Sequence, residues 1–252
     1  MIRIKEAFIR GAIWAFIGLL YGMLFVFFST FAEYWSLPID PYLFGGVLSG
    51  AIGALIYSSM RLAVLMTTIL SPLCIFYFIF AGKPTSLSII MIIAMLIGAI
   101  VGALYGSFSK GSRVNRADAK TLTGFSAGWI VSLCYLLFSN FSASHQIAII
   151  VALMCPLTGI LYVFLVPGFI KLYDNLLPPI GDGLMVGVGV SVFVTLSFFI
   201  MISSIDQEIA GSLIPVLQNI HHNLPGAMLG GVIGGGSAGI LSGMLLTKWQ
   251  DL

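Results

Sequence analysis

Charged residues are scarce in this 252-residue chain. Only 8% of its residues are Asp, Glu, Lys or Arg, whereas 59% are hydrophobic, and the mean hydropathy is +1.09. Soluble domains carry about 25% charged residues. So few charges cannot cover a surface that faces water, which excludes a water-soluble fold. We therefore expect a multi-pass protein of a cell membrane, with the lipid bilayer as its first partner.

Cysteine is nearly absent, and its three copies show no metal-binding or redox spacing. Cys74, Cys134 and Cys155 all lie inside apolar runs, and no pair forms a CxxC motif. A buried cysteine in such a run behaves as a small hydrophobic residue. We expect neither a disulfide framework nor a metal site from these residues.

The chain also lacks the motifs of an enzyme or a cofactor-binding protein. There is no P-loop, no HExxH, and no GxGxxG that opens a helix after a strand. Its histidines, His145, His221 and His222, fall in stretches that we assign to outer loops, where Asp206 and Glu208 also lie. Histidine and carboxylate could bind metal, but adjacent histidines point in different directions on a helix, so a solvated loop is favoured. We expect no catalytic residues, no metal, no cofactor and no enzyme activity.

Ionisable side chains are missing from the centres of the apolar runs. No Asp, Glu, Lys or His lies in the middle third of any of them. Proton relays and ion-coupled pumps depend on such groups inside the membrane. A proton-coupled mechanism is therefore disfavoured, and any conducted solute should be uncharged or weakly polar.

Eight apolar runs are long enough to cross a bilayer, at roughly 20 residues each. They use up nearly the whole chain, so residues 1–252 are predicted to form a single polytopic membrane domain. The fold class is an all-α bundle of about eight transmembrane helices. Residues 204–224 carry apolar residues near helical spacing and are predicted to lie in the interface, interrupted at Pro215. The predicted spans are 7–31, 42–60, 62–81, 87–108, 121–141, 147–169, 183–203 and 225–247.

The basic residues fix the orientation of these spans. With a cytoplasmic N-terminus, every Lys and Arg except Lys83 falls on the cytoplasmic side, as insertion requires. Both termini are then cytoplasmic, and the short loops are consistent with a bacterial inner membrane. The one basic cluster should face lipid headgroups, not nucleic acid. It consists of Lys110, Arg113, Arg116 and Lys120; the other cytoplasmic basic residues are Arg3, Lys5, Arg10, Arg61, Lys171 and Lys248.

A weak internal repeat appears where the inward-running spans end. The segments GALIY (53–57), GALY (102–105), GILY (159–162) and GILS (239–242) are alike, and a basic residue follows each. This pattern favours a duplication, either as halves 1–108 and 121–248 joined by a cytoplasmic linker, 109–120, or as four helical hairpins. The alternative is that glycine packing and tyrosine anchoring produced the likeness independently.

Glycine is abundant, and it recurs at every fourth residue. This glycine-zipper spacing makes a flat helix face that lets a second helix approach closely. Packing within the chain is the favoured interpretation; a groove for a partner helix or a glycine-lined pore is the alternative. Three consecutive glycines, 234–236, also predict a local break. The glycines of these faces are Gly98, Gly102 and Gly106 in one span and Gly231, Gly235, Gly239 and Gly243 in the last.

Two prolines lie within spans beside small polar residues. Proline frees a backbone carbonyl, and unwound backbone near the membrane midplane coordinates solutes in transporters, although proline kinks also serve packing alone. The predicted substrate path consists of Thr67, Thr68, Ser71 and Pro72 in one span and Cys155, Pro156 and Thr158 in another.

Two functions remain open. The first is a channel or permease for a small uncharged or weakly polar solute, without proton coupling. The second is a non-catalytic subunit or assembly factor of a larger membrane complex, whose glycine faces bind partner helices. The polar residues beside the prolines favour transport. The partners would be copies of the chain in a homo-oligomer or other membrane subunits, and no nucleic acid is expected.

Overall fold

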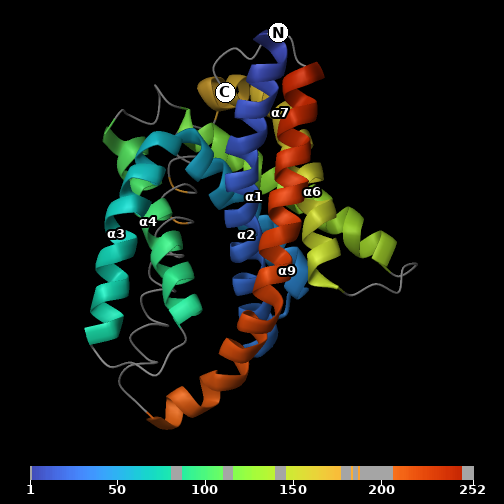
Figure 1. The fold of residues 1–252 in the computed structure, drawn as a ribbon. Helices are drawn as coiled ribbons and strands as arrows, with labels where there is room; N and C mark the ends of the chain where they lie inside the picture. Colours follow the sequence, from blue (N-terminus) through green and yellow to red (C-terminus); the bar gives the residue numbers. More distant parts are fainter. Residues whose placement is uncertain are drawn as a thin grey trace.

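The computed structural model of the chain describes residues 2–80, 87–109, 116–139, 146–176, 183, 187 and 207–245. Over these residues the fold is entirely helical, with seven helices and no strand. In chain order they are α1 (Ile2–Tyr34), α2 (Pro41–Ser58), α3 (Met60–Phe80), α4 (Leu87–Ser109), α6 (Ala117–Ser139), α7 (Ile147–Leu176) and α9 (Gln207–Leu245) (Figure 1).

Local signals explain where the second helix begins and ends. Asp40 is its N-cap: the carboxylate accepts hydrogen bonds from the backbone N–H groups of Tyr42 and Leu43, at 2.9 and 3.1 Å. Pro41 fits the first helical position, where no N–H donor is needed. At the other end the backbone N–H of Ser59 donates to the Ile56 carbonyl, and α3 starts at the next residue. The tight turn expected at Arg61 therefore lies two residues earlier.

Helices α1 and α9 pack against each other along most of their length (Figure 1). A Cβ added at Gly18 would overlap the Gly231 carbonyl, and one at Gly231 would overlap the Gly18 carbonyl. A Cβ at Gly239 would meet the Arg10 carbonyl oxygen at 2.7 Å, and one at Gly243 the Ala7 Cα at 2.8 Å. As residue numbers rise on one helix they fall on the other. The two helices are therefore antiparallel, with backbones in direct contact.

Two further pairs are antiparallel for the same reason. On α2 and α6, a Cβ at Gly50 would lie 2.6 Å from the Gly124 carbonyl oxygen, and one at Gly128 would lie 2.6 Å from that of Gly46. On α3 and α4, a Cβ at Gly98 would lie 2.6 Å from Thr67 Cα, and one at Gly102 would lie 2.7 Å from Ala63 Cα. Glycine thus brings helices closer than any other residue would permit.

The pair α7 and α9 is the exception, because these two helices run parallel. Ala148 of α7 lies beside Gly226 and Gly230 of α9, and Pro156 lies beside Gly234. The last residue of α7 and the first of α9 are therefore at opposite ends of the bundle. Residues 177–206 join those two ends.

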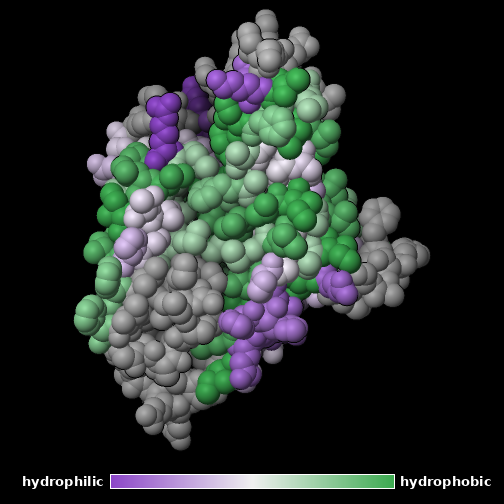
Figure 2. Space-filling view, viewed as in Figure 1, coloured by the Kyte–Doolittle hydropathy of each residue, from purple (hydrophilic) through white to green (hydrophobic). Residues whose placement is uncertain are grey.

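Four helices are long and apolar enough to cross a membrane: Ile4–Tyr34, Pro41–Ser58, Ile147–Asn175 and Ile214–Met244. They indicate a membrane protein. Figure 2 shows apolar residues across the middle of one face and hydrophilic residues toward both ends. One end, which we call the basic end, holds the start of α1, the α2–α3 turn, the start of α6 and the end of α7. Its described basic residues are Lys5, Arg10, Arg61, Arg116, Lys120 and Lys171.

Six of the predicted spans coincide with helices α1 to α7, but the last part of the chain differs from the prediction. Residues 204–224 and 225–247 were expected as an interfacial segment and a span; instead α9 is one helix of 39 residues that contains Pro215 and Pro225. The run of glycines at 234–236 does not break it, because Gly234 packs on Pro156 and Gly235 on Trp14. The span predicted at 183–203 lies outside the described residues except for positions 183 and 187.

The basic cluster of the 109–120 linker also differs from its prediction. Helix α6 begins at Ala117, and Lys120 within it is only 7% exposed. The Arg116 guanidinium forms an ion pair with the Asp174 carboxylate of α7, at 2.6 Å between Nη1 and Oδ1. The headgroup-facing interpretation is therefore wrong for the buried Lys120, whereas Arg116 is partly exposed and pairs within the chain. Lys110 and Arg113 lie outside the described residues.

The backbone contact between α1 and α9 predicts the effect of Gly231→Ala. The added methyl group would overlap the Gly18 carbonyl, so we expect a loss of at least about 1–3 kcal/mol, as for other overpacked cores. Gly168→Ala on α7 is the matched control, because nothing lies within 4 Å of its added Cβ. The measurement is the thermal unfolding midpoint in detergent: equal midpoints for the two variants would contradict this packing.

Candidate functional site

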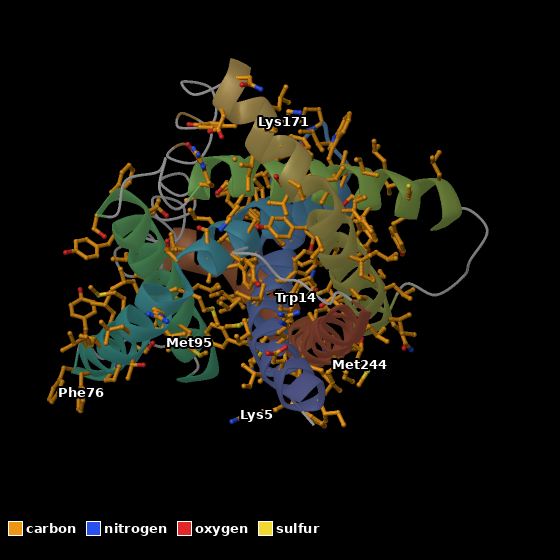
Figure 3. The ribbon with its side chains drawn as sticks, turned by 90° about the horizontal axis from the view of Figure 1, so that it is seen from above. Lys5, Trp14, Phe76, Met95, Lys171 and Met244 are labelled. Atoms are coloured by element: carbon orange, nitrogen blue, oxygen red, sulfur yellow. The ribbon has the colours of Figure 1, made fainter. Side chains whose placement is uncertain are left out.

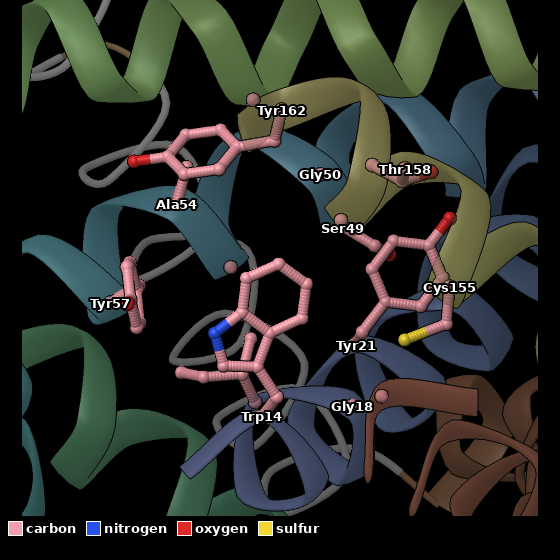
Figure 4. A pocket seen from close by; sticks show the side chains of 15 residues that line it. Trp14, Gly18, Tyr21, Ser49, Gly50, Ala54, Tyr57, Cys155, Thr158 and Tyr162 are labelled. Carbon is pink, nitrogen blue, oxygen red and sulfur yellow. The ribbon is translucent and has the colours of Figure 1, made fainter. Parts of the chain in front are cut away.

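A cavity of about 60 Å³ lies where α1, α2, α6, α7 and α9 meet (Figure 4). Trp14, which lines this cavity, lies near the centre of the molecule when the bundle is viewed from above, whereas Phe76 of α3 lies at the edge (Figure 3). A single water needs roughly 10–15 Å³ of such volume. The cavity therefore has room for a few waters or one small solute.

Aromatic rings form one side of the cavity. Trp14 and Tyr57 meet edge to face, with ring centroids 6.2 Å apart and planes at 78°. Tyr57 and Tyr162 meet in the same way, at 6.3 Å and 89°. Such edge-to-face pairs hold rings in defined orientations. Rigid rings from α1, α2 and α7 thus define this part of the wall (Figure 4).

Hydroxyl groups supply the polarity of the cavity. Ser49 is 0% exposed, and neither its Oγ nor the Tyr162 hydroxyl has a hydrogen-bond partner among the described residues. The Tyr21 hydroxyl points to the side of the cavity where Thr158 and Cys155 lie (Figure 4). Buried polar atoms are rarely left unpaired, and those without a protein partner usually bind water or a ligand. We therefore expect a hydrogen-bonding molecule inside the cavity.

The lining carries no charge. The described residues around the cavity are aromatic, aliphatic, small or hydroxyl-bearing, with Cys155 as the one thiol. Burying an ion without a charged partner is costly. Among the described residues there is also no group of three or more His, Cys, Asp or Glu side chains that could hold a metal ion. The site is thus suited to a small neutral molecule that donates or accepts hydrogen bonds.

The predicted substrate path is divided by the fold. Cys155 and Thr158 line the cavity, and Pro156 packs on Gly234 just behind them. The residues of α3 do not line it, because α3 packs mainly on α4. Moreover, α3 continues through Pro72 and α7 through Pro156, so neither helix is broken there.

Two of the polar residues of α3, Thr67 and Thr68, satisfy their own helix, whereas the Ser71 Oγ is buried without a described hydrogen-bond partner. The hydroxyls of Thr67 and Thr68 donate to the carbonyls of Ala63 and Val64, at 2.7 and 2.9 Å. Thr68 and Pro72 are exposed, and Ser71 is partly exposed. On an apolar outer surface such hydrogen bonds hide a hydroxyl without making a binding site.

The predicted glycine faces are covered by helices of the same chain. Helix α1 covers the α9 face, which consists of Gly231, Gly235, Gly239 and Gly243. Helix α3 covers the α4 face, which consists of Gly98, Gly102 and Gly106. These glycines therefore serve internal packing, the interpretation that their spacing favoured.

Sequence reasoning missed much of the cavity wall. Trp14 and Tyr21 are ordinary aromatic residues of an apolar run, and no motif marks them. Two signals were present: Tyr57 and Tyr162 end two copies of the weak repeat, and Ser49 stands among the glycines of α2. Neither signal indicates that these residues meet in space.

Comparison with protein-family models, with curated proteins and with solved structures finds no match to this chain. The functional conclusion therefore depends on the geometry of the site.

If the cavity holds water or a solute, Tyr162→Phe should destabilise the protein. Losing a hydroxyl that binds a cavity molecule should lower stability by about 1 kcal/mol. Tyr105→Phe is the control, because Tyr105 ends another copy of the repeat but is 57% exposed. Thermal unfolding in detergent distinguishes the outcomes: a midpoint that rises in Tyr162→Phe would mean that the hydroxyl has no partner and the cavity is dry.

Proposed function

We propose that this protein is a membrane channel or permease for a small uncharged or weakly polar solute, and that its mechanism is not proton-coupled. The observation that carries the proposal is the central cavity, where buried hydroxyls without described protein partners share an uncharged wall with aromatic rings. Polar groups buried inside an apolar bundle are costly unless they are hydrogen-bonded. A neutral solute with hydrogen-bonding groups would match them.

The substrate path of the proposal is revised accordingly. It runs through the cavity beside Cys155 and Thr158, and no longer through the predicted residues of α3. The lining residues Tyr21, Ser49 and Tyr162 are added to it. The apolar outer face of α3, which includes Leu65, Leu73 and Phe76, would then contact lipid.

The helix directions support eight crossings with both termini on one side. Successive helices α1, α2, α3, α4, α6 and α7 alternate in direction, and α9 is antiparallel to α1. Since α7 and α9 are parallel, one more crossing between them completes the alternation, and the apolar run 183–203 has the required length. The positive-inside rule then puts the basic end in the cytoplasm. The short loops favour a bacterial inner membrane.

The alternative function, a non-catalytic subunit of a larger complex, has less support. It relied on glycine faces that α1 and α3 cover. The native mass of the protein in mild detergent, with all co-purifying chains identified, separates the two proposals. A monomer or closed homo-oligomer fits transport, whereas a fixed stoichiometry with other proteins would favour the subunit.

Two threonines provide a matched test of transport. Thr158→Val removes a cavity hydroxyl and should slow solute flux by roughly two- to tenfold, the rate equivalent of one hydrogen bond of about 0.5–1.5 kcal/mol. Thr68→Val removes an exposed hydroxyl on α3 and should leave flux unchanged. Flux would be followed by light scattering from proteoliposomes that shrink and re-swell in urea or glycerol.

Two outcomes would count against the proposal. If neither solute nor water enters the proteoliposomes faster than it enters protein-free vesicles, a channel for small neutral solutes is rejected. If Thr68→Val slows flux and Thr158→Val does not, the path lies along α3.

A further inference from the structure

A second hollow lies at the end of the bundle opposite the basic end, and we call it the outer hollow. It has a volume of about 330 Å³ and a polar lining drawn from α1, α2, α7 and α9. Its polar residues are Ser29, Thr30, Glu33, Tyr42, Asn219 and Asn223. It is large enough for a hydrated solute, so it is a suitable place for a solute to wait before it enters the central cavity.

One face of α1 connects the two spaces. Tyr21 lines the central cavity, and Ser29 lines the outer hollow. Phe25 lies midway between them, four residues from each, and residues four apart share a helix face. Each step of four residues is about 6 Å along the helix axis. Phe25 therefore lies on this face between the two spaces.

The ring contacts of Phe25 confirm its intermediate position. It stacks on Tyr21 with centroids 6.3 Å apart and planes at 18°, and on Tyr42 with centroids 6.1 Å apart and planes at 8°. Tyr42 lines the outer hollow, so the stack runs from one space to the other. Phe25 itself is 0% exposed.

The other helices complete the barrier at the same level. On α2, Gly45 and Gly46 lie between Tyr42 and Ser49; a Cβ at Gly45 would be 3.4 Å from the Phe25 ring. On α7, Met154 reaches this level, because a Cβ at Gly46 would be 2.8 Å from its methyl group. The barrier thus combines one ring, one flexible thioether and glycine backbone. The thioether is the most adaptable of these parts.

The opposite side of the cavity is thinner. Tyr57 lines the central cavity and also a hollow at the basic end, beside Ser59 and Arg61. A single side chain therefore borders both spaces there.

We propose that Phe25 is the gate residue of the outer side: displacement of its ring from between Tyr21 and Tyr42 joins the outer hollow to the central cavity. The gate rests on the proposed function, because it regulates access to the same cavity. Gly45 places no side chain against the ring on α2, where an added Cβ would lie 3.4 Å from it, and the Met154 chain can adjust on α7.

Cys155 offers a native reporter, since its thiol lines the central cavity. With Cys74 and Cys134 changed to Ser, silver ions applied from the outer side would modify only Cys155. The modification rate is read from the loss of later maleimide labelling in denaturant. We expect Phe25→Ala to raise this rate by about tenfold or more, equivalent to a barrier lowered by about 1.4 kcal/mol. Phe25→Leu, which keeps an apolar side chain for folding, should raise it by less.

Phe27→Ala is the matched control. Phe27 is also buried on α1, its ring contacts include Phe28 and Phe31, and none of these three residues lines either space. A second reporter is Ser49→Cys in a chain with Cys155→Ser. Its silver modification rate should again be highest in Phe25→Ala, lower in Phe25→Leu and lowest with Phe25 unchanged. Unchanged rates for both Phe25 variants, or an equal rise in Phe27→Ala, would overturn the gate.

This readout requires no solute flux, so it separates the gate from the proposed function. Faster modification in a protein that conducts no solute would keep the gate and reject the transport function. Normal flux without faster modification would reject the gate alone.

Discussion

The close approach of helix backbones at glycine is the interaction on which the rest of this structure depends. Lipid tails are as apolar as leucine, so helices in a membrane gain little from hiding apolar side chains from lipid. They gain instead from van der Waals contact, which grows as the backbones come closer. From Ala7 beside Gly243 to Gly22 beside Ala227, α1 and α9 keep this contact over several turns. The same contact sets the directions of the other pairs.

Glycine also creates the space inside the bundle. Gly18, Gly50, Gly124 and Gly235 are contact residues between helices, and they line the central cavity as well. Where two glycine faces meet next to bulky rings, the rings hold the neighbouring helices apart and the missing side chains leave a void. A larger residue at these positions would close the cavity and separate the helices. The same glycines therefore account for both the close helix packing and the cavity.

The distribution of polarity follows from the same arrangement. In the part of the chain that the structure describes, charged residues lie near the ends of the bundle, whereas Ser49 and Tyr162, whose hydroxyls have no described partner, line the central cavity. Exposed hydroxyls, such as that of Thr68, bind their own helix and remain hidden from lipid. The hydroxyls of Ser49 and Tyr162 differ in that they face a space. This contrast is the strongest physical argument that the space holds a molecule.

Much of the fold could be predicted from the sequence, because apolar run length and glycine spacing are local signals. The helices through α7, the alternation of their directions and the internal use of the glycine faces all follow from such signals. The continuity of α9 could not be predicted, since tertiary contacts at Gly234 and Gly235 outweigh the weak helix propensity of glycine. Only some of the residues that line the cavity could be predicted. Cys155 and Thr158 have polar character that marks them, but Trp14 and Tyr21 become site residues only when distant helices meet.

A density map of the protein in a lipid nanodisc, at a resolution that shows ordered water, would test the central claim most directly. The account predicts an ordered molecule within hydrogen-bonding distance of the Ser49 Oγ and the Tyr162 hydroxyl, with α1 and α9 in backbone contact beside it. If those hydroxyls instead bind side chains that fill the cavity, the account is contradicted, because no space remains for a solute.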